Sequence, residues 1–165
     1  MTIASSTDVF FDQLTDLDSA TQQTAQTLPQ LIEWSTDPKL REALHAYQSA
    51  IARHTNDIQS VFAAHSRQPG NDTCKAIAGL IEGGNAHIQA AGDAIVRDCL
   101  IIAHSNRIGH YIRAATEFTL GMARRCRFTP ESDTLAEMLA RQQDFTSWLA
   151  EVTALAFDVE MGGVG

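Results

Sequence analysis

Hydrophobic residues recur along this chain at alternating steps of three and four positions, the spacing that places side chains on one face of an α-helix. The longest such pattern lies between Asp98 and Met122, at positions Ile101, Ser105, Ile108, Ile112, Ala115, Thr119 and Met122. No proline interrupts this stretch, so it predicts one long amphipathic helix. Three other segments carry a matching stripe, and the pattern therefore predicts that this helix forms one wall of a helical bundle.

Two of the matching segments come earlier in the chain. The first is expected to begin after Ser6 or Thr7, either of which can cap a helix, and Pro29 inside it predicts a kink or a break. Its stripe consists of Phe10, Leu14, Leu17, Thr21, Thr24, Leu28 and Leu31. The second is expected to begin with Asp37 as its cap and Pro38 as its first residue, and to end before the breaker cluster at 67–70. Its stripe consists of Leu40, Leu44, Tyr47, Ile51, His54, Ile58 and Val61.

A short helix is predicted next, with Asn71 or Asp72 as its cap and an apolar side formed by Cys74, Ile77, Leu80 and Ile81. The glycines at 83–84 are expected to weaken its far end, at about 1 kcal/mol each relative to alanine, and to leave 85–91 irregular. Gly92 and Asp93 then introduce the long helix described first. The last helix is expected to start after Thr129 and Pro130. Its stripe consists of Leu135, Met138, Gln142, Phe145, Leu149, Val152 and Ala156.

These elements predict an all-α fold, because no strand-like alternation of useful length is present. We expect a single domain over 1–165, with a core at about 7–157 and a frayed tail at 158–165. The architecture is predicted to be an up-down four-helix bundle, with an additional short helix between the second and third long helices.

Charge and cysteine content exclude several classes of protein. The net charge of −8 would repel a phosphate backbone, so we expect no nucleic-acid partner. No segment approaches the roughly 18 apolar residues of a membrane span, and the N-terminus lacks the pattern of a signal peptide, so we expect no membrane association. The three cysteines show no CxxC spacing, which favours reduced thiols and a cytoplasmic location.

The middle of three stripes is polar, and an antiparallel bundle would bring these positions into one layer. They are Thr21, His54 and Gln142, while the fourth stripe offers Ile112 there, with Gly109 one turn away. A ferritin-like di-iron protein places its metals in such a layer, with a Glu from each of two helices and Glu-x-x-His from each of the other two. No carboxylate stands at these positions. We therefore expect no metal, and a buried neutral His54 bonded to Gln142 or Thr21.

Three stretches of the chain are similar to motifs of one known family. Residues 10–21, FFDQLTDLDSAT, are similar to L-F-x-D-E-L-x-D-L-Y-x-A-E, and residues 74–83, CKAIAGLIEG, to C-K-A-M-x-G-L-I-x-E-G. Residues 109–112, GHYI, stand where that family has E-H-Y-E. In this order and spacing, from Phe10 to about Leu149, the chain resembles the bacterial YciF/YciE family of ferritin-like stress-response proteins.

The resemblance implies a ferritin-like bundle, commonly a homodimer, with a dinuclear metal site in family members that keep the ligands. Here the family's first-helix Glu falls on Thr21, and the two Glu of E-H-Y-E fall on Gly109 and Ile112. The acidic cluster of the last helix falls on Arg141, Gln142 and Thr146. The resemblance therefore implies a divergent member that lacks most of the metal ligands.

Three functional hypotheses follow. The first is a non-catalytic protein, without cofactor, that acts in stress response through protein–protein contacts, as a homodimer or with a protein partner that the sequence does not identify. The alternative is an iron or manganese protein of oxidase or storage type, in which His54 binds metal with carboxylates such as Asp57, Glu82 or Glu117. A third is a small-molecule pocket in the bundle centre, where Gly109 and Thr21 are smaller than glutamate.

Overall fold

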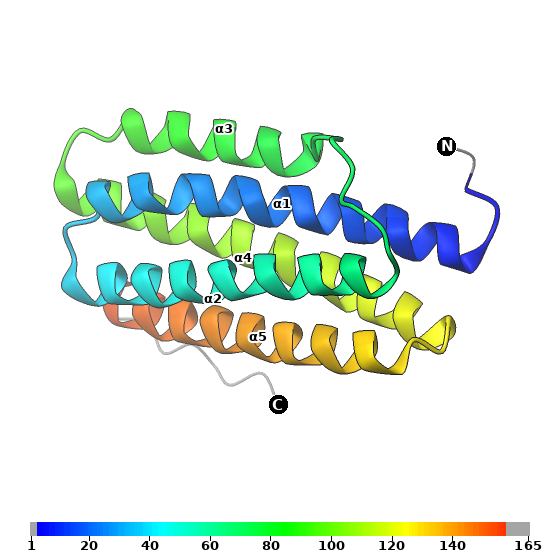
Figure 1. Ribbon diagram of the computed structural model, residues 1–165. Coiled ribbons are helices and arrows are strands. Elements are labelled where there is room, and N and C mark those ends of the chain that lie inside the picture. The colour runs from blue at the N-terminus through cyan, green and yellow to red at the C-terminus, as the bar shows by residue number, and fades with distance from the viewer. Residues whose placement is uncertain (1–2, 158–165) are drawn as a thin grey trace.

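A computed structural model describes residues 3–157, which form five helices and no strand (Figure 1). The helices are α1 (Ser6–Trp34), α2 (Pro38–Ala64), α3 (Lys75–Gln89), α4 (Ala94–Arg125) and α5 (Thr129–Phe157). The predicted all-α fold with one short helix between the second and third long helices is therefore confirmed. No helix in the described range is long and apolar enough to cross a membrane.

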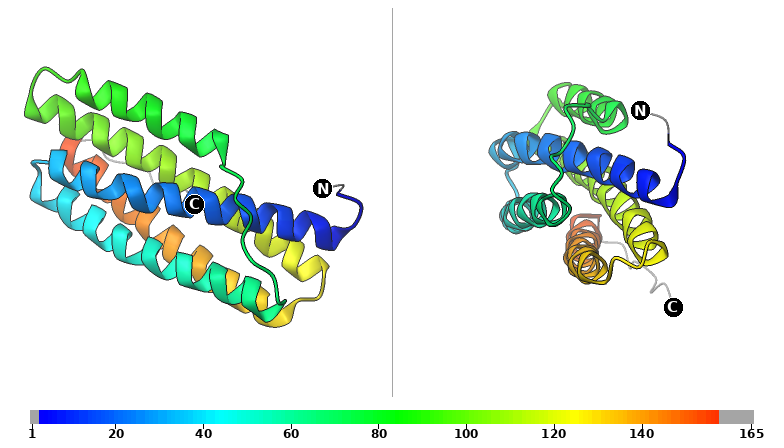
Figure 2. Two further views of the ribbon diagram at one scale, coloured as in Figure 1. Left: turned by 45° about the horizontal axis from the view of Figure 1, so that its top comes forward. Right: turned by 45° about the vertical axis from the view of Figure 1, so that its right-hand side comes forward.

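The four long helices form the bundle, and α3 lies outside it (Figures 1 and 2). Both α1 and α5 pack against α2 and α4, whereas α3 packs against α4 and more lightly against α1. The helices alternate in direction along the chain, and α3 runs antiparallel to α2 and α4 along part of the bundle (Figure 1). As a result α2 and α4 run in the same direction at opposite corners of the bundle.

Local capping decides where most helices begin. Asp37 caps α2 with Pro38 in the first turn, as predicted, and Asp93, which was expected to introduce α4, is the cap of that helix. The cap of α1 is Ser5, one residue before the predicted positions. Its hydroxyl accepts a hydrogen bond from the Asp8 amide at 3.1 Å, and the Asp8 carboxylate accepts from the Ser5 amide at 2.9 Å. This reciprocal capping box stabilises the start of α1.

Local predictions about α3 are wrong, and of the kink or break expected at Pro29 the break does not occur, because packing overrides local propensity. Helix α1 continues through Pro29, and Leu28 and Leu31 on either side are buried. The cap of α3 is Cys74, instead of Asn71 or Asp72, and its amide donates to the Ser19 hydroxyl at 2.9 Å. Helix α3 also stays regular to Gln89, across both glycines.

The predicted stripes form the core. Every predicted stripe residue of α1 and α2 is buried, as are those of α5 up to Val152. In α4 the stripe is buried except for Ala115 and Met122, which are half-buried. The side chain of Ala156 and the predicted tail at 158–165 lie outside the residues that the structure describes.

Candidate functional site

Contacts between α1 and α2 set the level of the first two polar residues of the bundle centre. The Phe11 ring lies 6.2 Å from the Phe62 ring and 5.1 Å from the His65 ring, measured between centroids. Because α1 and α2 are antiparallel, a residue ten positions after Phe11 in α1 lies level with residues ten positions before Phe62 and His65 in α2. Thr21 is therefore level with residues 52–55. Thr21 and His54 therefore lie at the same level of the bundle.

Contacts of α5 add the remaining members of the layer. His65 Nε2 lies 2.8 Å from Glu131 Oε1, and eleven residues further along each antiparallel helix stand His54 and Gln142. Gln142 in turn donates through Nε2 to the carbonyl of Gly109 at 3.0 Å. Thr21, His54 and Gln142 therefore lie at one level of the bundle, and all three are completely buried.

Gln142 on α5 forms hydrogen bonds to both α2 and α4 at this level. Besides Gly109 on α4, its Nε2 donates to the Tyr47 hydroxyl on α2 at 3.1 Å. Both amide hydrogens are then used, and Oε1 has no partner among the described residues. Burial raises the pKa of the Tyr47 hydroxyl, so this group stays protonated at neutral pH. The contact between Gln142 and Tyr47 was not predicted, although both residues lie on the predicted stripes.

His54 is buried and neutral, but the bond predicted to Gln142 or Thr21 is not formed. Both ring nitrogens lack a hydrogen-bond partner among the described residues. Burial and, as the smaller cause, the positive charge of Arg141 together lower the pKa of His54 to about 4. The imidazole is therefore neutral at physiological pH, with one N–H donor and one acceptor nitrogen.

Aromatic packing fills the space beside Gly109. A Cβ added at Gly109 would lie 3.0 Å from Phe145 Cε1 and 3.3 Å from Thr146 Cγ2. The Phe145 ring is itself stacked on the Tyr47 ring, with centroids 3.6 Å apart and planes within 3°. The space left by the absence of a side chain at Gly109 is therefore occupied by Phe145 and Thr146.

The residues of the layer do not fit the dinuclear metal centre that the ferritin-like fold implies. The described residues contain no group of three or more His, Cys, Asp or Glu side chains placed to hold a metal ion. Asp57 is paired with Arg141, and Glu82 and Glu117 are exposed. Carboxylates that bridge two cations are thus absent around His54 in the described part of the chain.

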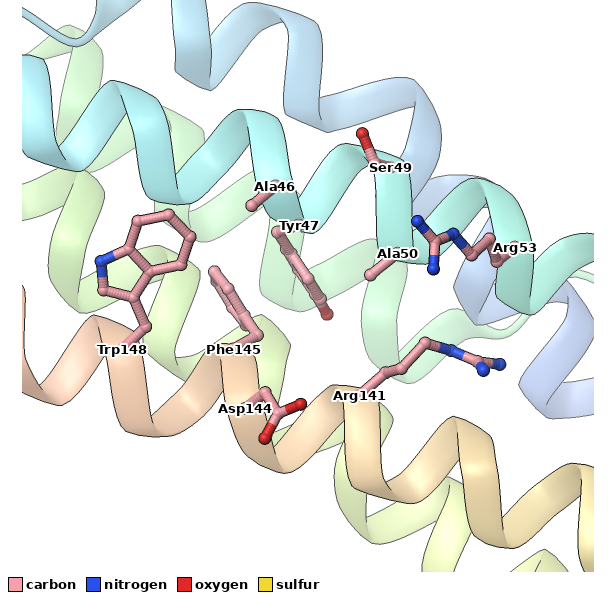
Figure 3. A pocket seen from close by; sticks show the side chains of 9 residues that line it. All are labelled: Ala46, Tyr47, Ser49, Ala50, Arg53, Arg141, Asp144, Phe145 and Trp148. Carbon is pink, nitrogen blue, oxygen red and sulfur yellow. The ribbon is translucent and has the colours of Figure 1, made fainter.

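A shallow groove lies just outside this layer, between α2 and α5 (Figure 3). It has a volume of about 250 Å³ and is lined by Ala46, Tyr47, Ser49, Ala50, Arg53, Arg141, Asp144, Phe145 and Trp148. In Figure 3 the Arg53 side chain extends back over Ala50, whereas the Arg141 guanidinium points away from the aromatic rings. Small side chains on α2 therefore open the groove, and aromatic side chains close its floor.

A second polar cluster, which the sequence did not reveal, joins α3 to the bundle. Cys74 Sγ lies 3.0 Å from the Tyr111 hydroxyl, which donates to Asp16 Oδ2 at 3.3 Å. Burial, followed by the contact with Cys74, raises the pKa of Tyr111. The Cys74 carbonyl also accepts from Gln23 Nε2 at 3.1 Å. These bonds anchor the start of α3 to α1 and α4, which is a structural role.

Comparison with known proteins agrees with this architecture. The chain is 28% identical over 137 residues to protein YciF of Escherichia coli strain K12, covering 82% of each protein. The crystal structure of the E. coli stress protein YciF matches with a TM-score of 0.89 at 25% identity, over 94% of this chain and 99% of that one. YcfI from Rhodopseudomonas palustris has the same fold, with a TM-score of 0.86 at 24% identity, over 90% of this chain and 94% of that one.

A family model supports the same relationship over almost the whole chain. The model described as "Domain of unknown function (DUF892)" matches residues 5–158, which include all four helices of the bundle and α3. The ferritin-like bundle and the likeness to YciF that the motifs indicated are therefore confirmed. This chain belongs to the DUF892 family.

Proposed function

We propose that this protein is a non-catalytic member of its family, which holds no dinuclear metal and acts through protein–protein contacts as a homodimer. The observation that carries the proposal is the packing of the central layer. Thr21, Gly109, Ile112 and Gln142 stand where the resemblance implies glutamate or other acidic ligands, and Phe145 fills the space beside Gly109. The stress protein YciF supports a role in stress response, which we propose for this chain as well.

Electrostatics around the layer also support a metal-free centre. A pair of divalent cations requires several carboxylates to neutralise it, and Arg141 brings a positive charge to this level instead. The same charge that lowers the pKa of His54 would repel a metal cation. The carboxylate of Asp57 is engaged by Arg141.

An apolar patch at one end of the bundle supports the proposed contact between two copies. Ile95 on α4 is 78% exposed and Leu155 on α5 is 64% exposed. Together with Cys99, Ile102 and Val152 they form the apolar part of a hollow of about 440 Å³, which the charged residues Asp37, Lys39 and Asp98 also line. We call the five apolar residues the α4–α5 patch. Exposed apolar surface of this kind marks interaction sites in many proteins.

Metal analysis tests the central part of the proposal. Protein purified without chelators or an affinity tag is incubated with Fe(II) or Mn(II), desalted and measured by mass spectrometry. We expect less than about a tenth of an equivalent of metal, because the donor set is too poor to retain it. A stoichiometric transition metal would overturn the proposal and favour the iron or manganese alternative with His54 as a ligand.

Oligomeric state tests the second part. Sedimentation velocity of the full chain across a range of micromolar concentrations is expected to show a dimer of two 18.0 kDa chains. A homogeneous monomer over the whole range would contradict the homodimer. The metal result is independent of this measurement, so the two parts of the proposal can fail separately.

A further inference from the structure

The central layer contains more buried polar atoms than hydrogen-bond partners. Both ring nitrogens of His54, the hydroxyl of Thr21 and Oε1 of Gln142 have no partner among the described residues. All three side chains are 0% exposed. Nearly all buried polar groups in folded proteins are hydrogen-bonded, so four unpaired atoms at one level of the bundle indicate a bound polar group.

The Thr21 hydroxyl differs from the hydroxyls of the other completely buried threonines in the bundle. Thr24 and Thr116, which are also 0% exposed, each donate to the carbonyl four residues earlier in their own helix at 2.8 Å. Thr21 makes no such bond. Its hydroxyl is therefore available to a group in the bundle interior, where it can both donate and accept.

The mixture of donors and acceptors identifies the class of ligand. A neutral imidazole offers one donor and one acceptor, the Thr21 hydroxyl offers both, and Gln142 Oε1 only accepts. A metal cation could bind only to the acceptor atoms of this set and would leave the donors unpaired. The positive charge of Arg141 also disfavours the binding of a cation. Water, which donates two hydrogen bonds and accepts two, matches this set and is the usual occupant of small polar sites inside proteins.

We propose that the central layer binds internal water, with at least one ordered water molecule bonded to His54, Thr21 and Gln142. The water would join α1, α2 and α5 at the level where metal-binding relatives of this fold place carboxylates. The proposal concerns the interior of one chain, so it does not depend on the proposed dimer and is tested separately from it.

Water relaxation measurements on the full chain count these molecules directly. The ¹⁷O magnetic relaxation dispersion of water is compared for the wild type, Thr21→Val and Thr24→Val at neutral pH. Both substitutions replace a buried threonine of α1 by a side chain of the same shape, so Thr24→Val is a matched control. We expect Thr21→Val to lose the contribution of at least one long-lived water that the wild type and Thr24→Val retain. Equal amplitudes in all three proteins would overturn the proposal.

Denaturation gives a second readout with a predicted sign. In a dry layer the Thr21 hydroxyl would be an unpaired buried group, and its removal would raise the urea midpoint above that of the wild type. With water bound, Thr21→Val loses a hydrogen bond and its midpoint falls, as it does for Thr24→Val. A raised midpoint for Thr21→Val would contradict the proposal, and so would a stoichiometric metal that His54→Leu removes.

Discussion

At the scale of single residues, Gly109 shows how closely the bundle centre is packed. A Cβ at this position would lie 3.0 Å from Phe145 Cε1, and the Phe145 ring is held against Tyr47 by stacking. The side chains must shift to accept even one methyl group. We therefore predict that Gly109→Ala lowers the free energy of unfolding by about 1–3 kcal/mol, measured by urea denaturation.

Gly121 provides the matched control on the same helix. No atom lies within 4 Å of a Cβ built there, and the position is exposed. Gly121→Ala should raise the free energy of unfolding by about 1 kcal/mol, since alanine is the better helix former. Opposite signs for the two variants are expected. If Gly109→Ala were as stabilising as Gly121→Ala, the tight packing around the layer would be refuted.

The buried His54 predicts how stability depends on pH. Burial, followed by the charge of Arg141, lowers the pKa of His54 from 6.5 to about 4. Between these two pH values the unfolded chain binds a proton that the folded chain does not bind. Stability due to His54 is therefore complete above pH 6.5 and declines as the pH falls toward 4, by about 3 kcal/mol in total.

Substitution isolates this contribution. His104 is buried as well, and burial, followed by the charges of Arg107 and His87, also lowers its pKa to about 4. His54→Leu should therefore remove only part of the slope of stability against pH in this window, whereas the exposed His45→Gln should retain all of it. Urea titrations at several pH values measure the slope. An unchanged slope in His54→Leu would show that His54 is protonated equally in both states.

At the scale of elements, α3 depends on a close approach to α4 at one residue. A Cβ at Gly84 would lie 1.9 Å from His104 Nδ1, and the His104 ring is 1% exposed. The other buried side chains of α3 are only Ile77 and Ile88. A side chain at Gly84 would therefore displace the buried His104 ring or move α3 away from α4.

This contact predicts a local effect of Gly84→Ala. We expect α3 to open more readily by about 2 kcal/mol, seen as faster amide hydrogen exchange over 75–89 than in the other helices. Gly83→Ala is the control, because nothing lies within 4 Å of its Cβ and the position is exposed. Faster exchange spread evenly over all five helices would contradict a role confined to α3.

The same elements show what sequence patterns can and cannot predict. The stripes of α1 and α2 and the cap Asp37 were predicted because they follow from spacing and local chemistry along one helix. The regular course of α3 across its glycines was missed, since it depends on the His104 ring from another helix. Likewise the level of Gln142 was predicted from periodicity, but its bonds to Tyr47 and Gly109 depend on three helices at once.

At the scale of the whole molecule, the net charge opposes the association of two copies, whereas the α4–α5 patch favours it. Each chain carries a net charge of −8, so two copies repel over a distance set by the ionic strength. Burial of apolar surface from Ile95 and Leu155 would favour association. Added salt screens the repulsion without weakening the apolar contact, so the proposed dimer should bind more tightly as salt is raised.

Substitution within the patch tests whether it forms the interface. Ile95→Lys places a charge at the most exposed large apolar side chain among the described residues, which is 78% exposed. We predict that it raises the dimer dissociation constant at least about tenfold, equivalent to 1.4 kcal/mol, in sedimentation at physiological salt. The control is Phe118→Lys, which changes an apolar side chain of the same helix that is 53% exposed and outside the patch. Because both variants reduce the net charge equally, a change in long-range repulsion would affect them alike. Only a contact at the patch would make the dissociation constant of Ile95→Lys larger than that of Phe118→Lys.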